Sequence, residues 1–253
     1  MRKISIIGLE SLPDVRPGDN IAELIVEAAG REGVGIEDGD VIVVAQKIVS
    51  KAEGLIVDLK DVKPSEKAIE LAKRTGKDAR FVELVLRESS HVLKADESTI
   101  IVDRGGFVCI NAGIDRSNVG GEARFSLLPS DPDESARRIA KDILRLTGKR
   151  VFVIVSDTSS RPLRQGQVDF AIGLAGLNPF RDYRGKRDLY GYMLRVKRVA
   201  FADELASAAE LVIGQGDEGI PVAIIRGVNV EESNSSAKEL TISRKLDLFS
   251  GAV

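Results

Sequence analysis

Two short segments combine carboxylate, hydroxyl and amide side chains directly after apolar runs that are typical of β-strands. Residues 111–118, with Asp115, follow the run 107–110, and residues 156–161, with Asp157, follow the run 151–155. A buried strand that enters such a turn places oxygen ligands at its exposed end, where a divalent cation and a phosphate can be held together. Because Asp, Asn and Ser also fill ordinary turns, these residues alone leave a metal site and two structural turns as equal alternatives.

A glycine-rich turn, residues 214–219, contains three glycines among six residues. Glycine allows backbone N–H groups to approach an anion, and the side chains of Gln215, Asp217 and Glu218 add oxygen atoms. The turn matches neither the dinucleotide-binding fingerprint nor the P-loop, and an ordinary helix end with a turn explains it equally well. Lys51, which follows the apolar run 41–44, is either a phosphate partner or a solvated lysine.

Cationic side chains gather between the second acidic turn and residues 188–191. They suit an anionic substrate that carries phosphates or carboxylates, although scattered surface charge is an equal alternative. The single histidine, His91, has no neighbouring Cys or His and is not expected to bind a metal. No Ser-His-Asp or Cys-His arrangement can be assembled, so we do not expect covalent nucleophilic catalysis. The cations of this basic region are Arg161, Arg164, Arg181, Arg184, Lys186 and Arg187.

The composition indicates a globular protein. The chain has 253 residues, of which 43% are hydrophobic, and a formal net charge of −2. This length can bury a substantial core, and the balanced charge argues against a general nucleic-acid binder. The single cysteine, Cys109, lies in an apolar run and is expected to be a core residue of a cytoplasmic protein. No apolar stretch reaches the roughly 18–20 residues that span a bilayer, so no membrane association is expected.

Apolar periodicity and capping residues predict an α+β fold, a mixed sheet-and-helix arrangement that is neither a Rossmann nor a P-loop fold. We expect one unit over residues 1–253, with two interwoven subdomains as the alternative. Residues 231–237 are expected to be loose. Strands are predicted at residues 3–7, 41–44 (in the centre of a sheet), 99–102, 107–110, 151–155 and 222–225. Helices are predicted to begin after the caps Asp19, Ser65, Asp78 and Asp131, and at Ala202.

Two of the predicted helices have a defined apolar side. In the helix after Ser65 the inward residues are predicted to be Ile69, Leu71 and Ala72. In the helix that runs to Thr147 the apolar side is predicted to contain Ile139, Ile143, Leu144 and Leu146.

Five segments, taken in order, make the chain resemble the gamma-glutamyl ligases of coenzyme F-420, a hydroxy-deazaflavin cofactor. They are residues 50–54, 111–118, 156–158, 188–191 and 214–221. The resemblance implies a GTP-dependent ligase that joins L-glutamate to the lactyl carboxylate of the precursor coenzyme and then adds a further gamma-linked glutamate. It also implies a homodimer, two Mn²⁺ or Mg²⁺ ions and an assisting K⁺.

Carried over by position, the resemblance implies that Asp115 and Asp157 hold one divalent ion, and that Thr158 and Gln215 hold the second. Asp115, Asp157 and Lys51 are the expected catalytic residues. Gln215 stands where some relatives carry Glu, and Gln46 and Lys47 replace small hydroxyl residues. The expected GTP contacts are Leu12, Pro13, Asp14, Val15, Gln46, Lys47, Lys51, Asn118, Ile213, Gly214, Gln215, Gly216, Asp217, Glu218, Gly219 and Ile220.

Two other functions share these motifs. One is a metal-dependent GTP hydrolase, or a glutamate ligase that acts on a different acid. The other is a nucleotide sensor without catalysis. The presence of two carboxylates after apolar runs disfavours this sensor.

Overall fold

The computed structural model describes residues 3–97, 99–243 and 245–248. The chain divides into two compact units. Unit 1 contains the residues up to Val15 together with Asp19–Val49 and Ser130–Leu240, and unit 2 contains Arg16–Gly18, Ser50–Pro129 and the residues from Thr241 onward. In the described part of the chain, no helix has both the length and the apolar character that crossing a membrane requires.

Unit 1 is built on a five-stranded mixed sheet with the order β1 (Ser5–Gly8), β12 (Val222–Arg226), β2 (Val41–Ala45), β8 (Phe152–Arg161) and β9 (Arg164–Ala175). β2 and β8 are parallel, and the other three pairs are antiparallel. A Rossmann sheet is mostly parallel, so the predicted α+β class is confirmed. β2 lies in the centre of the sheet and Val41 to Val44 are fully buried, as its continuous apolar run predicts.

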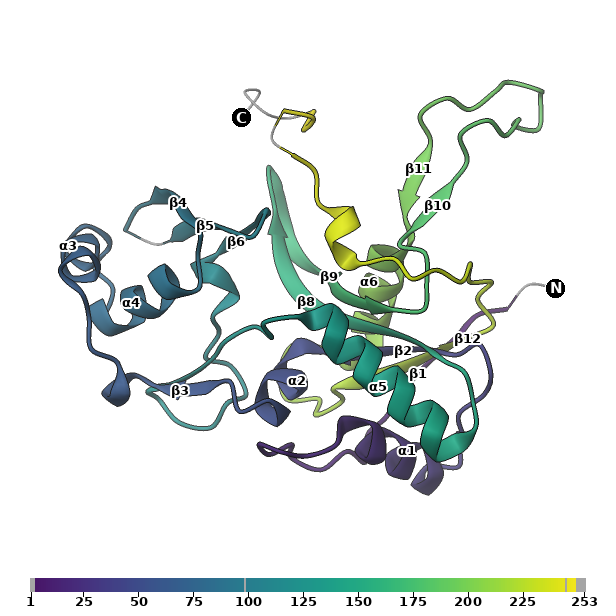
Figure 1. The fold of residues 1–253 in the computed structure, drawn as a ribbon, viewed down its shortest axis with the longest axis horizontal. Helices are drawn as coiled ribbons and strands as arrows, with labels where there is room; N and C mark the ends of the chain where they lie inside the picture. The colour runs from purple at the N-terminus through teal and green to yellow at the C-terminus, as the bar shows by residue number, and fades with distance from the viewer. Residues whose placement is uncertain (1–2, 98, 244, 249–253) are drawn as a thin grey trace. The chain divides into compact units, whose positions relative to one another are not determined.

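Helices cover both faces of this sheet (Figure 1). α6 (Phe201–Ile213) packs with η3 (Ala237–Leu240) against a cluster that includes Val43, Ile154 and Ile225. α1 (Ile21–Arg31) and α5 (Pro132–Thr147) pack against each other, and α5 also contacts β8 and β9. The side chain of Asn20 caps α1, in place of the predicted Asp19, because it accepts from two N–H groups of the first turn.

α5 begins after the predicted cap Asp131 and ends at Gly148, which has the left-handed φ of +70°. Its buried stripe is narrower than predicted. Ala136, Ile139 and Ile143 are buried, whereas the leucines that flank the stripe are 45% and 40% exposed. The inward assignments of Leu144 and Leu146 were therefore wrong.

The predicted second acidic turn, residues 156–161, is part of a strand. β8 continues to Arg161 and pairs with β9, so that Thr158 lies directly across from Asp169. Hydroxyl and β-branched residues are well tolerated in a paired strand, and no glycine or proline interrupts this stretch before Pro162. Asp157 therefore lies within a strand and not at its end.

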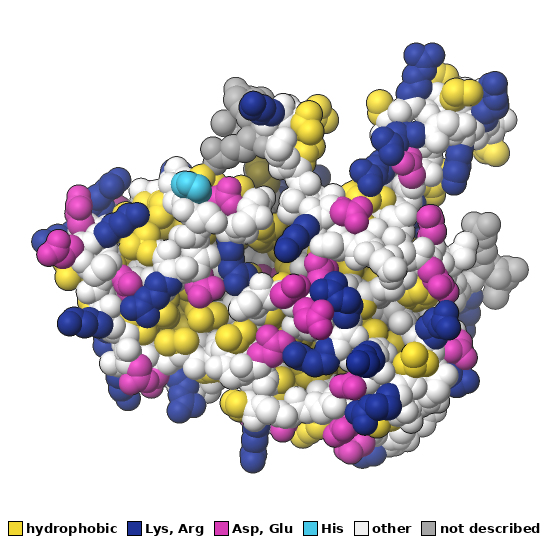
Figure 2. Space-filling model, viewed as in Figure 1, with side chains coloured by type: hydrophobic (Ala, Val, Ile, Leu, Met, Phe, Trp, Pro, Cys, Tyr) yellow, Lys and Arg dark blue, Asp and Glu magenta, His cyan; other side chains and the backbone are white. Residues whose placement is uncertain are grey.

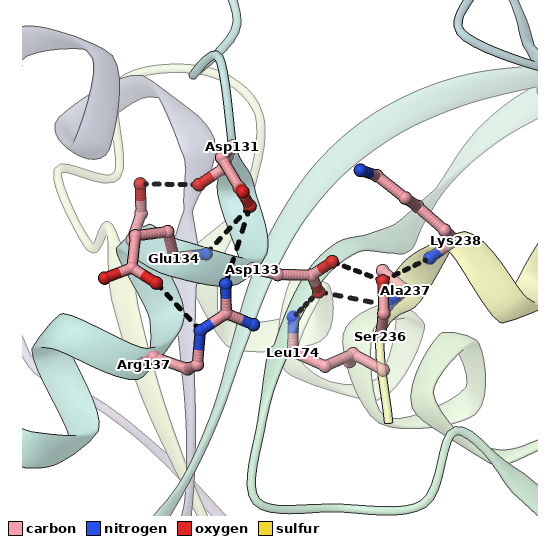
Figure 3. Close-up of polar contacts among 9 residues, drawn as sticks. Asp131, Asp133, Glu134, Arg137, Leu174, Ser236, Ala237 and Lys238 are labelled. Atoms are coloured by element: carbon pink, nitrogen blue, oxygen red, sulfur yellow. Dashed lines mark hydrogen bonds and ion pairs between the residues drawn. The ribbon is translucent and has the colours of Figure 1, made fainter. Parts of the chain in front are cut away.

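Residues 231–237, predicted to be loose, are held by a buried carboxylate at the start of α5 (Figure 3). Asp133 accepts hydrogen bonds from the backbone N of Leu174 at 2.8 Å and of Ala237 at 3.0 Å, and from the hydroxyl of Ser236. Ser233 also donates its N–H to the backbone carbonyl of Gly176, the residue directly after β9. The polar composition of this segment thus reflects partners that the sequence alone does not show.

Unit 2 has its own core between two helices and a small sheet. The core contains Leu71, Val82, Val85, Ile100 and Val102. The elements are α3 (Glu66–Thr75), α4 (Ala79–Arg87), an antiparallel sheet of β4 (His91–Ala95), β5 (Ile100–Arg104) and β6 (Phe107–Ile110), the pair β3 (Ile56–Asp58) and β7 (Arg124–Ser126), and the short helices η1 (Leu59–Asp61) and η2 (Asn111–Gly113). α2 (Gln46–Ala52) carries Gln46 and Lys47 in unit 1 and Lys51 in unit 2.

The predicted caps of unit 2 are confirmed, but two predictions of burial are not. Ser65 and Asp78 accept hydrogen bonds from the first turns of α3 and α4. Ile69 is 41% exposed, so its inward assignment was wrong. In β6, Val108 and Ile110 are exposed, because this strand lies at the edge of its sheet and only alternate residues face the core.

A buried glutamate ties α3 to α4. Glu83 accepts hydrogen bonds from the N and Oγ of Ser65 at 2.9 and 2.6 Å and from Nε of Arg87 at 2.9 Å. The Ser65 hydroxyl is the largest of the interactions that lower the pKa of the Glu83 carboxyl. A lowered folded-state pKa adds stability above the pKa of the unfolded chain, and this stability is lost as the pH falls through the folded-state value.

We therefore expect Glu83→Gln to lower the free energy of unfolding by about 1–2 kcal/mol at neutral pH, because an amide oxygen accepts more weakly than a carboxylate. The difference from the wild type should shrink once the pH falls below about 4, where glutamate protonates in the unfolded chain. Urea unfolding of the wild type and the variant, at neutral pH and at a pH below about 4, measures this difference in the free energy of unfolding. Glu70→Gln, on the exposed face of α3, is the control and should change little. A loss that is equal at both pH values would contradict the assignment to charge.

Candidate functional site

The segments of unit 1 that were predicted to bind nucleotide and metal leave the five-stranded sheet at a single edge. β12 runs antiparallel to both of its neighbours, so that Val222, at its start, pairs with Val44 near the end of β2. Gly8, the last residue of β1, pairs with Ala223. Ala45, the last residue of β2, pairs with Ser156 of β8. The loop after β1, the start of α2 directly after β2, the extension of β8 and the loop before β12 therefore begin side by side.

Backbone hydrogen bonds join these segments where they leave the sheet. Leu9 donates its N–H to Val222 and Ala45 donates to Pro221, both at 2.9 Å. Ile220 packs so closely on Gly8 that an added Cβ there would lie 2.7 Å from its Cγ2 atom. The predicted nucleotide contacts that follow β1 and β2 differ in their exposure. Pro13 and Asp14 are exposed, Leu12 and Lys47 are half-buried, and Val15 and Gln46 are buried.

The glycine-rich loop is folded around one of its own carboxylates. Gly216 donates its N–H to Oε2 of Glu218 at 2.8 Å. Gly214 has φ +70°, and a Cβ on it would lie 2.2 Å from Cδ of Glu218. Glycine is required at this position both for its φ and for the close approach. One of the N–H groups that the loop could offer to a phosphate, that of Gly216, is therefore engaged by Glu218.

Thr158 and Gln215, the pair predicted for a second ion, lie in contact, with Oγ1 and Oε1 3.1 Å apart. Both contact the carboxylate of Asp169, which is 3% exposed on β9. Its Oδ1 lies 2.8 Å from Thr158 Oγ1 and 3.0 Å from Gln215 Nε2, and its Oδ2 lies 3.1 Å from Ser156 Oγ. Burial raises the pKa of Asp169, and these hydrogen bonds offset part of that rise.

Asp157 has a different orientation from its neighbours. The hydrogen bonds to Asp169 show that Ser156 and Thr158 share one face of β8. Side chains alternate along a strand, so Asp157 points to the opposite face. Asp157 and Thr158 therefore face opposite sides of β8.

In unit 2, Asp115 lies in a bridge with Ser126, with backbone hydrogen bonds of 3.2 and 2.8 Å. Its carboxylate accepts from the N–H of Arg116 at 2.6 Å, the N–H of Ser117 at 3.1 Å and the Ser117 hydroxyl. The carboxylate is exposed but held in one orientation. Asn118 follows with φ +53°, a left-handed conformation that Asn tolerates better than most residues. Lys51 is half-buried in the last turn of α2.

No group of three or more His, Cys, Asp or Glu side chains is poised for a metal ion within the described ranges of the chain. The oxygen donors that the structure brings together in unit 1 are a hydroxyl, an amide and a carboxylate, from Thr158, Gln215 and Asp169. Hard oxygen donors of these kinds suit Mg²⁺ or Mn²⁺.

The comparison with known protein families matches residues 10–227 to the family described as F420-0:gamma-glutamyl ligase. The chain belongs to this family. The coenzyme F420:L-glutamate ligase of Methanothermobacter thermautotrophicus is 49% identical over 98% of this chain and 99% of its own length. The enzymes of the same name from Methanocaldococcus jannaschii and Archaeoglobus fulgidus are 46% and 44% identical, each over 98% of this chain and 97% and 96% of their own lengths.

The basic region of this gamma-glutamyl ligase family member is divided between two hairpins of unit 1. Arg161 and Arg164 flank the β8–β9 turn, and the other four cations lie in the hairpin of β10 (Phe180–Asp182) and β11 (Arg198–Ala200). Arg181 stacks on the Phe201 ring at 3.8 Å, and Arg184 pairs with Asp182. These two cations are therefore partly structural.

The connection between β10 and β11 exposes apolar and cationic side chains together (Figure 2). Leu189 is 99%, Tyr190 96% and Val196 89% exposed. Residues 188–191 are one of the segments that carried the resemblance to the ligase family, and the structure places them near the middle of this connection.

Sequence reasoning missed Asp169, whose carboxylate lies at the centre of the Thr158–Gln215 contact. Residues 164–170 alternate polar and apolar side chains only loosely, and nothing in their types sets Asp169 apart from an exposed strand residue. The signal is the pairing of β8 with β9, which becomes visible only in three dimensions.

Proposed function

We propose that the chain is a GTP-dependent ligase that joins L-glutamate through an amide to the lactyl carboxylate of the F-420 precursor and then adds a further gamma-linked glutamate. Membership of the gamma-glutamyl ligase family and the names of the relatives support the acceptor and the amino acid. The observation that supports the nucleotide dependence is the single sheet edge of unit 1. The loops that contain Leu12 and Ile220, and the start of α2 at Gln46, leave the sheet there, beside the extension of β8 that carries Thr158.

An amide does not form from a carboxylate and an amine at a useful rate unless the acid is activated. We propose that a carboxylate oxygen of the acceptor attacks the γ-phosphorus of GTP, which breaks the bond to GDP and forms an acyl phosphate. The glutamate amine then attacks the acyl carbon, loses a proton, and releases phosphate. Both steps build negative charge on phosphate oxygens, so positioned cations and N–H donors are the expected means of catalysis.

We assign the residues to three tasks, which are holding one divalent ion, holding a second ion and binding GTP. Asp115 and Asp157 would hold one divalent ion, and Thr158 with Gln215 would hold the second, with K⁺ assisting. The bound Mn²⁺ or Mg²⁺ would neutralise charge on the phosphate oxygens. Lys51 and Asn118, with the segments 12–15, 46–47 and 213–220, would bind GTP. The Gly216 N–H can serve a phosphate once the Glu218 carboxylate moves away from it.

The anionic coenzyme precursor fits the cationic hairpin between β10 and β11. Lys186, Arg187 and Arg195 lie in the same connection as the exposed Tyr190. A connection that carries both cationic side chains and an exposed aromatic ring suits a ligand that combines a planar ring with a phosphodiester. We propose that this hairpin binds the precursor and that the ligase acts as a homodimer.

The test is mass spectrometry of the deazaflavin after incubation of the protein with precursor coenzyme, L-glutamate, GTP and Mn²⁺. We expect a gain of one or two glutamyl units that depends on GTP and is absent when ATP replaces it. An unchanged coenzyme together with GDP formation would contradict the proposal and indicate a hydrolase or a different acceptor acid. Binding of GTP without any turnover would indicate a sensor.

A further inference from the structure

Asp169 is a buried carboxylate that has no cationic partner among the residues that the structure describes. It is 3% exposed, and within the described part of the chain no Lys or Arg forms an ion pair with it. Burying a carboxylate without such a pair is costly, even where hydrogen bonds partly compensate. Its three side-chain partners are Ser156, Thr158 and Gln215, and two of these are the pair proposed above for the second divalent ion. A residue placed at such a cost suggests a role beyond packing.

The contact with Asp169 fixes which way the Gln215 amide faces. The oxygen and nitrogen of an amide are told apart by their partners, and an ionised carboxylate can only accept. Gln215 therefore turns Nε2 toward Asp169 Oδ1, at 3.0 Å, and this leaves Oε1 facing Thr158. If the carboxylate were removed, either end of the amide could face Thr158.

Asp169 also decides where the single hydroxyl proton of Thr158 points. Thr158 Oγ1 lies 2.8 Å from Asp169 Oδ1 and 3.1 Å from Gln215 Oε1, so its one proton can serve only one of them. The charged and closer acceptor is the stronger. With the proton on that side, Thr158 Oγ1 and Gln215 Oε1 present lone pairs to each other, an arrangement that a cation between them would stabilise.

The spacing of these two oxygens matches one ion. Two ligand oxygens at right angles, each about 2.0–2.1 Å from an octahedral ion, lie about 2.9 Å apart. The observed separation is 3.1 Å. The Asp169 carboxylate is itself held in place, because Ser156 Oγ contacts its second oxygen at 3.1 Å and Thr158 lies directly across from it in the β8–β9 register. The register shifts between Val155 and Ser156, an irregularity of the kind that re-aims side chains beside active sites.

We propose that Asp169 is a positioning residue of the ligase: its carboxylate orients the Thr158 hydroxyl and the Gln215 amide so that both oxygens face one divalent ion. This inference rests on the proposed function for the identity of the ion, but not for the geometry. Partners that orient metal ligands in this way usually contribute 10- to 100-fold to metal affinity.

The test is titration of the full-length protein with Mn²⁺ alone, followed by electron paramagnetic resonance. Asp169→Asn should weaken one class of Mn²⁺ site by about 10- to 100-fold. The matched control is Asp203→Asn. Asp203 is a half-buried carboxylate whose pKa is also raised by burial. It accepts a hydrogen bond from the N–H of Ala171 on β9, and neither Thr158 nor Gln215 is among its contacts in the described part of the chain. It should bind Mn²⁺ like the wild type. Ser156→Ala, which removes only the hydrogen bond to Oδ2, should show a smaller weakening and serves if Asp169→Asn fails to fold.

In the ligase assay, Asp169→Asn should raise the Mn²⁺ concentration needed for half-maximal rate and recover most of the wild-type kcat at saturating Mn²⁺. A merely structural role would lower kcat without moving the metal dependence. The inference is overturned by a folded Asp169→Asn protein with unchanged Mn²⁺ affinity, by an equal loss in Asp203→Asn, or by a wild type that binds no Mn²⁺. Failure of the proposed function would appear separately, as a wild type that binds Mn²⁺ but does not extend the coenzyme.

Discussion

Asp115→Asn should lower ligase turnover by about 10²- to 10⁴-fold while leaving the protein folded. The first part follows from the proposed role of the carboxylate, since removal of one element that stabilises developing charge commonly costs at least 10²-fold. The second part follows from its contacts. An Asn oxygen can still accept from the N–H groups of Arg116 and Ser117, and its amide can donate to the Ser117 hydroxyl in place of accepting from it.

The measurement is single-turnover formation of the glutamyl product, together with the thermal unfolding temperature of each variant. The control is Asp103→Asn in the same unit, where an aspartate also closes an exposed turn by accepting from the N–H of Gly106 at 2.7 Å. That variant should retain full turnover. Near-normal activity of a folded Asp115→Asn protein would refute the assignment of this residue to the ion.

The largest effect on stability is expected for Asp133→Ala. Asp133 is buried, and its removal leaves the N–H groups of Leu174 and Ala237 without their acceptor and the Ser236 hydroxyl without its partner (Figure 3). A buried donor that loses its partner costs about 1–3 kcal/mol, so we expect a loss of about 3–5 kcal/mol in the free energy of unfolding.

Urea unfolding measures the loss, and hydrogen exchange locates it. Amide exchange should accelerate over residues 231–240 and at the end of β9. Asp131→Ala is the matched control on the same helix, because it removes an exposed cap that accepts from the N–H of Glu134 at 2.9 Å and should cost about 0.5–2 kcal/mol. Equal losses in the two variants, or unchanged exchange over residues 231–240, would show that Asp133 does not hold this segment.

Local chemistry made much of the fold predictable. Ser65, Asp78 and Asp131 accept from N–H groups one turn away, and Gly76 and Gly148 end their helices with left-handed φ, so the signals for these helices lie within a few residues. The errors occur where a distant partner decides the outcome. Ser160 extends a strand because β9 pairs with it, and Val108 is exposed because β6 lies at a sheet edge.

The candidate site shows the same difference between what local signals predict and what distant partners decide. The family resemblance pointed to Thr158 and Gln215, and the structure brings these two residues into contact. Asp169 could not be found, because its role depends on a pairing between strands that the types of residues 164–170 do not reveal. Nor could the sequence show that the Glu218 carboxylate engages the N–H of Gly216 in the glycine-rich loop.

The order of the strands also has a consequence for folding during synthesis. β12 lies between β1 and β2, so the gap between the two N-terminal strands of unit 1 is filled by residues 222–226, which are synthesised late. Residues 50–129 of unit 2 form their core from a nearly continuous stretch and can fold while the chain is still growing. Until β12 emerges, the facing edges of β1 and β2 stay unpaired, and such edges favour aggregation. A nascent chain stalled before residue 222 would therefore be a natural client for chaperones that bind open strand edges.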